Sequence, residues 1–236
     1  MTNSPSPKDT EAEVVAEKSK NIVMECAFKG DSQRLAECFE DNEDNIYRGE
    51  VDALVNKRVE NGNSPLDIVA ILGKIEVARE LVNHEVEINA ANQKGYTALH
   101  RAALWGKIDV VKCLVENGAD LQLRTENKER PREIAVRYNQ TECVDYLDWA
   151  EAKIALQDTI KNLRETVADP EKVQGRLTKD DKNLSVNACN EKHDWLENTP
   201  DATTQDFITQ KRELDDLTEP IWIKLSEPVP EGQGKK

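Results

Sequence analysis

The side chains of this chain that could do chemistry are few and lie far apart. Three histidines, His84, His100 and His193, and five cysteines are spread over 236 residues, and none of them forms a Cys/His cluster with zinc spacing. A histidine base needs a nucleophile or a metal positioned beside it. No glycine-rich loop opens onto a lysine that would hold a phosphate. We therefore predict no catalytic, cofactor-binding or metal-ligating residue, no cofactor, and a protein that is not an enzyme.

The overall charge narrows the class of partner. The formal net charge is −14 and the isoelectric point is near 4.8. Nucleic acids and anionic membrane surfaces favour a basic face, which this balance does not provide. We predict one or more protein partners, and no nucleic acid, membrane or small-molecule substrate.

Three features favour a cytoplasmic location. No window holds the run of about 18 apolar residues that spans a bilayer. The opening "MTNSPSPKDTEAEVV" lacks the charged-then-apolar layout of a signal peptide. The cysteines are odd in number and have no C-x-x-C pair, as is typical of buried thiols in a reducing compartment. They are Cys26, Cys38, Cys113, Cys143 and Cys189.

The elements that carry these residues follow a repeat of 33 residues. Segments beginning at Ser64, Thr97 and Arg130 align without gaps. In each unit a hydroxyl or a proline starts a helix, a glycine or asparagine ends it, and a second helix with apolar residues at helical spacing follows. Three columns coincide: Ala70, Ala103 and Val136; Gly73, Gly106 and Asn139; and Leu81, Leu114 and Leu147.

The motifs "SPLDIV" at Ser64 and "TALHRA" at Thr97 resemble the T-P-L-H-x-A signature of the ankyrin repeat family. The resemblance implies a stack of helix pairs that binds other proteins, and a structural hydrogen-bonding role for the signature histidine. The third unit departs from the signature, because Arg132 and Glu133 stand where the family has Leu and His. We interpret this unit as the polar cap that ends the array.

Upstream, Ala27 and Gly30 repeat the Ala-x-x-Gly step of the later units. This predicts a degenerate N-terminal repeat over residues 21–60, with an acidic insertion at residues 41–50. An additional unit favours stability, since three repeats alone make a marginal stack.

A single helix is predicted over residues 141–168, where Gly and Pro are absent, and it would be about 42 Å long. Its apolar stripe needs helices downstream to bury it. A capping box at Thr178 begins a helix that ends near Asn198, and "TQDFITQKRELDDL" begins another that Pro220 interrupts. The stripe is Trp149, Ala152, Leu156, Ile160, Leu163 and Val167, and the last helix places Phe207, Lys211, Leu214 and Leu217 on one side.

Residues 166–225 resemble the C-terminal lid bundle of the heat-shock protein 70 family. The marks are the pair Trp195 and Leu196, the K-R-x-L run at residues 211–214, and the pair at residues 220–221. We expect no ATP-driven chaperoning, because the sequence shows neither the ATPase domain nor the peptide-holding β-sandwich of that family.

The candidate binding residues follow from the ankyrin resemblance, which implies that the first helix of each repeat and the finger before it face a concave binding side. A column of large side chains beside an arginine is typical of a binding hot spot. The alternative is that the acidic insertion or the long helix covers this face, which would make Trp105 a core residue. The column is Leu72, Trp105 and Tyr138, its neighbours are Ile68, Arg101 and Ile134, and Tyr96 lies on a finger.

The predicted fold class is all-α: a short ankyrin-repeat solenoid joined by a long helix to a small helical bundle that resembles the heat-shock 70 lid. The predicted organisation is a disordered tail at residues 1–20, the degenerate repeat at 21–60, three ankyrin repeats at 61–148, the long helix and bundle at 149–225, and a disordered tail at 226–236.

The predicted function is that of a non-catalytic adaptor or scaffold, which binds proteins through the ankyrin concave face and the C-terminal bundle. Two alternatives stay open. One is a structural component of a cytoskeletal assembly, in cell division or the cilium, and the other is a cofactor of heat-shock 70 chaperones.

Overall fold

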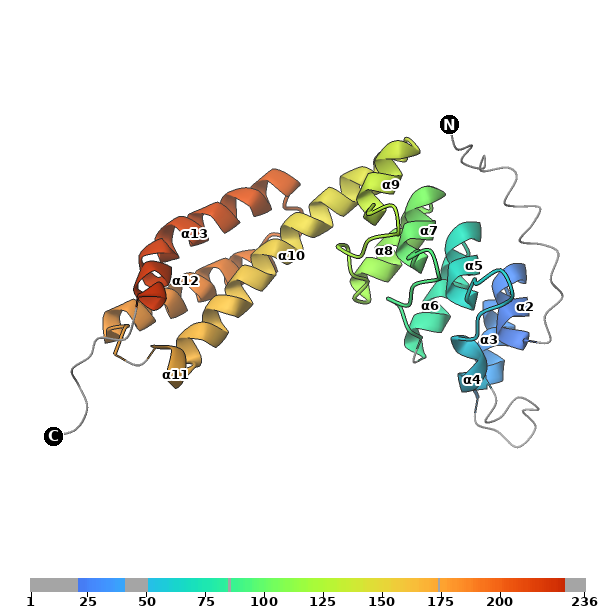
Figure 1. Ribbon diagram of the computed structural model, residues 1–236, viewed down its shortest axis with the longest axis horizontal. Coiled ribbons are helices and arrows are strands. Elements are labelled where there is room, and N and C mark those ends of the chain that lie inside the picture. The colour runs from blue at the N-terminus through green and yellow to red at the C-terminus, as the bar shows by residue number, and fades with distance from the viewer. Residues whose placement is uncertain (1–20, 41–50, 85, 174, 228–236) are drawn as a thin grey trace. The chain divides into compact units, whose positions relative to one another are not determined.

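A computed structural model describes residues 21–40, 51–84, 86–173 and 175–227. Every regular element in these ranges is a helix, which confirms the all-α fold class (Figure 1). The chain divides into two compact units, residues 1–147 and 148–236. The predicted acidic insertion and both predicted disordered tails, apart from Ser226 and Glu227, lie outside the described residues.

The first unit consists of helices in consecutive pairs. They are α2 (Ile22–Lys29) with α3 (Ser32–Phe39), α5 (Pro65–Leu72) with α6 (Ile75–Asn83), α7 (Ala98–Leu104) with α8 (Ile108–Glu116), and α9 (Pro131–Arg137) with the start of α10 (Thr141–Ala168); the short α4 (Val51–Val55) stands before α5. The first helices of the pairs, α2, α5, α7 and α9, contact one another in a row, and α3, α6 and α8 form a second row (Figure 1). We call the first row the inner helices. The solenoid predicted from the repeat is therefore confirmed.

Each inner helix is followed by a residue in the left-handed region, as the glycine and asparagine column predicts. The φ angles are 74° at Gly73, 63° at Gly106 and 56° at Asn139. A side chain at Gly73 would also collide with the next repeat, because an added Cβ would lie 2.9 Å from Cδ of Lys107. Glycine is needed there both for its backbone conformation and for the space that the lysine stem fills.

The loops before α5, α7 and α9 are three copies of one tight turn, here called fingers 1, 2 and 3 (residues 56–63, 89–96 and 122–129). In each finger a backbone N–H donates to the carbonyl four residues on, at 2.9–3.0 Å, and the residue before the acceptor has a positive φ. The donor–acceptor pairs are Val59 with Asn63, Asn92 with Tyr96, and Thr125 with Glu129. The fingers thus repeat with the same period of 33 residues as the helices.

His100 joins the second repeat to the third. Its Nδ1 accepts the backbone N–H of Thr97 at 3.2 Å, so the ring proton is on Nε2. Nε2 lies 3.1 Å from the carbonyl oxygen of Leu123 and 3.2 Å from that of Glu129, both in finger 3. Burial lowers the pKa of His100, which keeps the ring neutral and able to accept and donate at once. The structural role implied by the signature is confirmed.

In the first repeat, an arginine and an acid together replace the histidine. Asp67 Oδ2 accepts the backbone N–H of Ser64 at 2.8 Å and is paired with Arg58 Nη1 at 2.8 Å. Arg58 Nη2 then donates to the carbonyl of Ala90 at 3.1 Å, which stands 33 residues before Leu123. The acid caps the helix and the arginine reaches the next finger.

The third repeat also pairs an acid with an arginine, but the acid is longer and the arginine, Arg124, donates within its own finger to the carbonyl of Lys128 at 2.6 Å. Glu133 Oε2 accepts the backbone N–H of Arg130 at 2.8 Å and lies 3.5 Å from Arg124 Nη1. Arg124 occupies the repeat position of Arg58, where the second repeat has Ala91. In the third unit, Glu133 therefore provides the helix cap that His100 provides in the second unit.

The second unit contains most of α10, the short α11 (Pro170–Val173), α12 (Lys179–Asn198) and α13 (Thr204–Ser226). The predicted span of α10, its burial by downstream helices, and the capping box at Thr178 are confirmed. Phe207 stands at the centre, with its ring edge-to-face to Trp149 at 5.7 Å and to Trp195 at 5.6 Å. The core is formed by Leu156, Ile160, Leu163, Val167, Ala188, Cys189, Ala202, Phe207 and Leu214.

Two predictions for the last helix are wrong. Helix α13 continues through Pro220, because the carbonyl of Asp216, which loses its N–H partner, belongs to an exposed turn where water can bind it. The predicted stripe also mislocates Leu217, which is 43% exposed. The buried residues of α13 are Phe207, Leu214, Thr218 and Ile221.

The end of α13 is held to the start of α12. Lys224 Nζ lies 2.7 Å from Asp181 Oδ1, and Arg176 Nη1 donates to the carbonyl of Leu225 at 2.8 Å. Lys224, followed by the backbone N–H of Thr178, lowers the pKa of Asp181 to about 2. These contacts stabilise the turns of α13 that follow Pro220.

Two further results concern the whole described chain. All five cysteines are buried free thiols, as predicted. Within the described ranges, no helix combines the length and the apolar character that a membrane span requires.

We predict that His100→Asp lowers the free energy of unfolding by about 2 kcal/mol, because it removes the donor to finger 3 and buries a carboxylate. Adding Ala91→Arg should recover at least half of this loss, since residue 91 is exposed and occupies the position of Arg58. Urea denaturation of the wild type, both single variants and the double variant measures the coupling. Additive effects would contradict the proposed exchange of histidine for an arginine–acid pair.

We predict that lowering the pH from about 4 to 2 destabilises the second unit, in part through Asp181. A carboxyl group whose pKa is lower in the folded chain stabilises the fold at pH values above its pKa in the unfolded chain. This stabilisation is lost as the pH falls toward the folded-state pKa of about 2. Lys224→Gln should cost about 0.5 kcal/mol at neutral pH, as is usual for a partly exposed pair, and should flatten the acid dependence. Denaturation at several pH values, followed by tryptophan fluorescence, tests both effects. An unchanged slope in the variant would show that Lys224 does not set the acid response.

Candidate protein-binding surface

The predicted column of large side chains lies where the inner helices end. Leu72 is the last residue of α5, and Trp105 and Tyr138 are the C-cap residues of α7 and α9. All three side chains are half-buried. Each has surface available to a partner while its remainder packs on the repeat.

Two of the predicted neighbours do not belong to the surface. Ile68 and Ile134 are fully buried, each with no exposed surface. Their column points into the packing between repeats, where apolar side chains are needed. The prediction that these two isoleucines contact a partner is therefore wrong.

Arg101 occupies the same column but reaches the surface with its long side chain, as arginine often does. Its guanidinium carbon lies 4.9 Å from the centre of the Tyr96 ring, and Nη2 donates to Asn63 Oδ1 at 3.3 Å. Burial lowers the pKa of Arg101, and nearby Asp67 opposes this effect. The structure thus brings Arg101 and Tyr96 together as a stacked pair that connects finger 1 to finger 2.

Two buried polar atoms of this cluster have no hydrogen-bond partner within the described chain. They are Nε of Arg101 and Oδ1 of Asp67. Because buried polar atoms are normally satisfied, these two atoms are exceptions in the packing beneath the surface.

The charge of this surface is opposite to that of the chain. We define the inner surface as the fingers with the inner helices that follow them, residues 56–72, 89–105 and 122–138. These segments contain nine Lys or Arg residues and five Asp or Glu residues, a net charge of +4, whereas the whole chain carries −14. The net charge of the whole chain does not indicate this basic surface. The sequence would have shown it if the charges of the three equivalent segments had been summed separately.

Of the two remaining histidines, His84 packs against other side chains and His193 is exposed to solvent. The ring of His84 stacks on Phe39 at 3.5 Å, and its Nε2 lies 3.0 Å from Glu80 Oε1. His193 is exposed on α12. Over the part of the chain that the structure describes, no group of three or more His, Cys, Asp or Glu side chains is placed to hold a metal ion.

The comparisons with known proteins agree with this architecture. The family model for ankyrin repeats, in three copies, matches residues 23–125, from α2 to finger 3. Ankyrin repeat domain-containing protein 45 of Homo sapiens is 37% identical over 209 residues, which cover 89% of this chain and 78% of that protein. The protein of the same name from Mus musculus is 36% identical over 210 residues, covering 89% and 84%. That from Danio rerio is 44% identical over 133 residues, covering 56% and 59%.

Proposed function

This chain belongs to the family of ankyrin repeat domain-containing protein 45, and on that basis we propose that it is a non-catalytic adaptor. Ankyrin repeats are a protein–protein interaction module. In this proposal the inner surface binds one partner protein and the C-terminal bundle binds another.

One observation carries the proposal: half-buried aromatic side chains stand in a basic surface. Trp105 and Tyr138 have the residue type and the partial burial of interface anchors, which contribute most when a partner excludes water from them. Tyr96 and Arg101, already stacked on each other, lose little side-chain freedom on binding. Tryptophan, tyrosine and arginine are the residue types that interfaces favour.

The charge of the inner surface supports a proposal for the chemistry of the partner. A net charge of +4 on a chain of −14 favours an acidic segment that also carries apolar side chains. Attraction at this surface would orient such a segment, since complementary charge sets specificity and the rate of association. Exposed lysines on the fingers, such as Lys57 and Lys94, are placed to meet it first.

A non-catalytic role in the cytoplasm is supported by how the reactive side chains are used. Both nitrogens of His100 face the groups that hold the repeats together. All five thiols are free and buried, which suits a reducing compartment.

We predict that Trp105→Ala weakens binding of the inner-surface partner about tenfold, because it removes the largest anchor. Proximity labelling in cells, with wild type and variant at equal expression, identifies the partner as the protein lost from the labelled set. Thermal unfolding of the variant provides the control, and a shift of only a few degrees is expected. A large loss of stability would instead show that Trp105 is a core residue, and the surface proposal would then fail.

We predict that the double charge reversal Lys57→Glu and Lys94→Glu slows association with the same partner about tenfold at low salt. A matched variant, Lys161→Glu with Lys179→Glu, makes the same change of net charge on exposed residues of the second unit. Association rates of both, measured against ionic strength, separate a local effect from a global one. Equal slowing in the two variants would mean that the basic inner surface does not steer the partner.

The two alternative roles predicted from the sequence are distinguished by the same labelling. A labelled set dominated by cytoskeletal proteins would favour the structural role. A set dominated by heat-shock 70 chaperones, together with a change in their ATPase rate, would favour the cofactor role.

A further inference from the structure

Helix α13 has a second face beside the one that packs into the bundle. Its buried residues are spaced as one stripe, from Phe207 to Ile221. On the neighbouring face lie two large apolar side chains with substantial exposed surface, Trp222 at 38% and Ile223 at 53%. Exposed side chains of this size, adjacent in sequence at the end of a helix, are typical of a contact surface.

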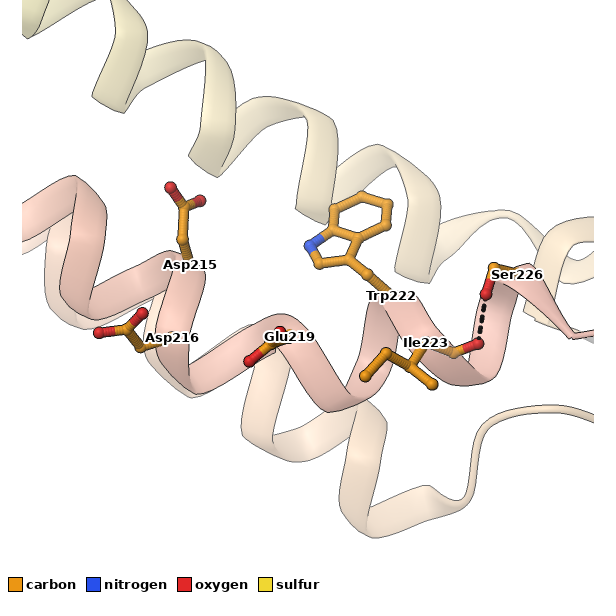
Figure 2. Close-up of a pocket in the computed structure, with 6 residues that line it drawn as sticks. All are labelled: Asp215, Asp216, Glu219, Trp222, Ile223 and Ser226. Carbon is orange, nitrogen blue, oxygen red and sulfur yellow. Dashed lines mark hydrogen bonds between the residues drawn. The ribbon is translucent and has the colours of Figure 1, made fainter.

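A shallow groove of about 500 Å³ follows this face. Figure 2 shows Asp215 and Trp222 on one side of the helix, Asp216 and Ile223 on the other, and Glu219 between them. The lining residues are Asp215, Asp216, Glu219, Trp222, Ile223 and Ser226. All six belong to α13, so the surface is one helix face with carboxylates at one end and apolar side chains at the other.

Two of the three carboxylates of the groove have no ion-pair partner among the described residues. Asp215 is paired with Lys211 at 2.6 Å. Within the described residues, Asp216 and Glu219 have no basic side chain within ion-pair distance, which is 4.0 Å. In addition, Pro220 has no N–H to donate to the carbonyl of Asp216, so this oxygen can accept a bond from outside.

The positions of these groups determine the pattern that a ligand must have. Asp216 and Ile223, like Asp215 and Trp222, are two helical turns apart, about 10.5 Å along the axis. A second helix lying along α13 would need basic residues in the half that contacts the carboxylates. About seven positions away, it would need large apolar residues to contact Trp222 and Ile223. Binding of an amphipathic helix by such a face is an established mode of recognition.

We propose that this face of α13 binds a basic amphipathic helix of a partner protein. Lysine or arginine side chains of that helix pair with Asp216 and Glu219, and its apolar side chains cover Trp222 and Ile223. The proposal names the chemistry of the partner for the bundle and rests on the adaptor function proposed above.

The test uses the full chain and a labelled peptide of about 16 residues. The peptide consists of alanine except for three lysines in one half and three leucines in the other, placed to match the spacing of the lining residues. A peptide with the reversed sequence serves as a second probe. The control peptide has the same composition, with lysines and leucines alternating. Fluorescence anisotropy should show binding of one patterned peptide at least tenfold tighter than that of the control, and weakening as salt rises.

Matched variants locate the binding. Asp216→Asn with Glu219→Gln, and separately Ile223→Ser, should each weaken the patterned peptide about tenfold. Asp158→Asn with Asp194→Asn removes two exposed carboxylates elsewhere on the bundle, and Leu217→Ser removes an exposed apolar side chain of α13 outside the groove. Both control variants should bind as the wild type does.

Three results would overturn the proposal. The first is equal binding of patterned and control peptides, and the second is equal weakening in the groove and control variants. The third is self-association that Ile223→Ser abolishes, measured by sedimentation, because a second copy of the chain would then be the occupant. Trp105→Ala should leave peptide affinity unchanged, so failure of this groove and failure of the inner surface are separate results.

Discussion

The first two of the three repeats that begin with fingers 1, 2 and 3 are each joined to the next by a hydrogen-bonding link, in which a side chain at the start of an inner helix caps that helix and a donor reaches a carbonyl of the next finger. In the second repeat His100 does both tasks with its two ring nitrogens. In the first repeat Asp67 caps and Arg58 donates. A buried carbonyl left without a donor costs more than an ordinary hydrogen bond contributes, which gives both links a large effect on how the repeats stack. These links hold fingers 2 and 3 against the preceding repeat, and the fingers form part of the inner surface.

The use of an acid as the helix cap accounts for two arginines of the inner surface. When the capping residue is an acid, it cannot donate, and an arginine of the finger pairs with it, as Arg58 and Arg124 do. The acid compensates only one charge, and the other arginines and lysines of the fingers and inner helices bring the surface to a net +4. The bundle has the opposite character on α13, where Asp216 and Glu219 stand beside exposed apolar side chains. The chain therefore has two surfaces of opposite charge, for which we propose different classes of protein segment as partners.

Much of the fold could be predicted from the sequence, because its signals are local. Gly73 and Gly106 follow the ends of helices because glycine adopts a positive φ easily, which is a property of the residue itself. The capping box at Thr178 and the span of α10 also depend only on residues that are near in sequence. The errors concern properties that depend on surroundings. Proline usually ends a helix, but at Pro220 the packing of Ile221 and the contacts of Lys224 hold the helix together beyond it. Ile68 and Ile134 share a column with Arg101, and only the packing shows that this column points inward.

The candidate surface was predictable in outline, since the period of 33 residues places Leu72, Trp105 and Tyr138 at equivalent helix ends. The pairing of Arg101 with Tyr96 could not be predicted, because it joins residues of different elements through side-chain conformations. The groove on α13 was missed because Trp222 and Ile223 look like core residues in a sequence. Their exposure depends on how many sides of α13 the bundle covers.

The spaces beside three glycines that follow inner helices are filled by side chains of the next repeat. The space beside Gly30 receives the stem of Lys74, that beside Gly73 receives Lys107, and that beside Gly106 receives Gln140, whose amide also donates to the carbonyl of Leu104 at 3.2 Å. Every layer is thus completed by the layer that comes after it in the chain. In a chain made from its N-terminus, each of these glycines is therefore synthesised about 44 or 34 residues before the side chain that covers it, at the spacings Gly30–Lys74, Gly73–Lys107 and Gly106–Gln140.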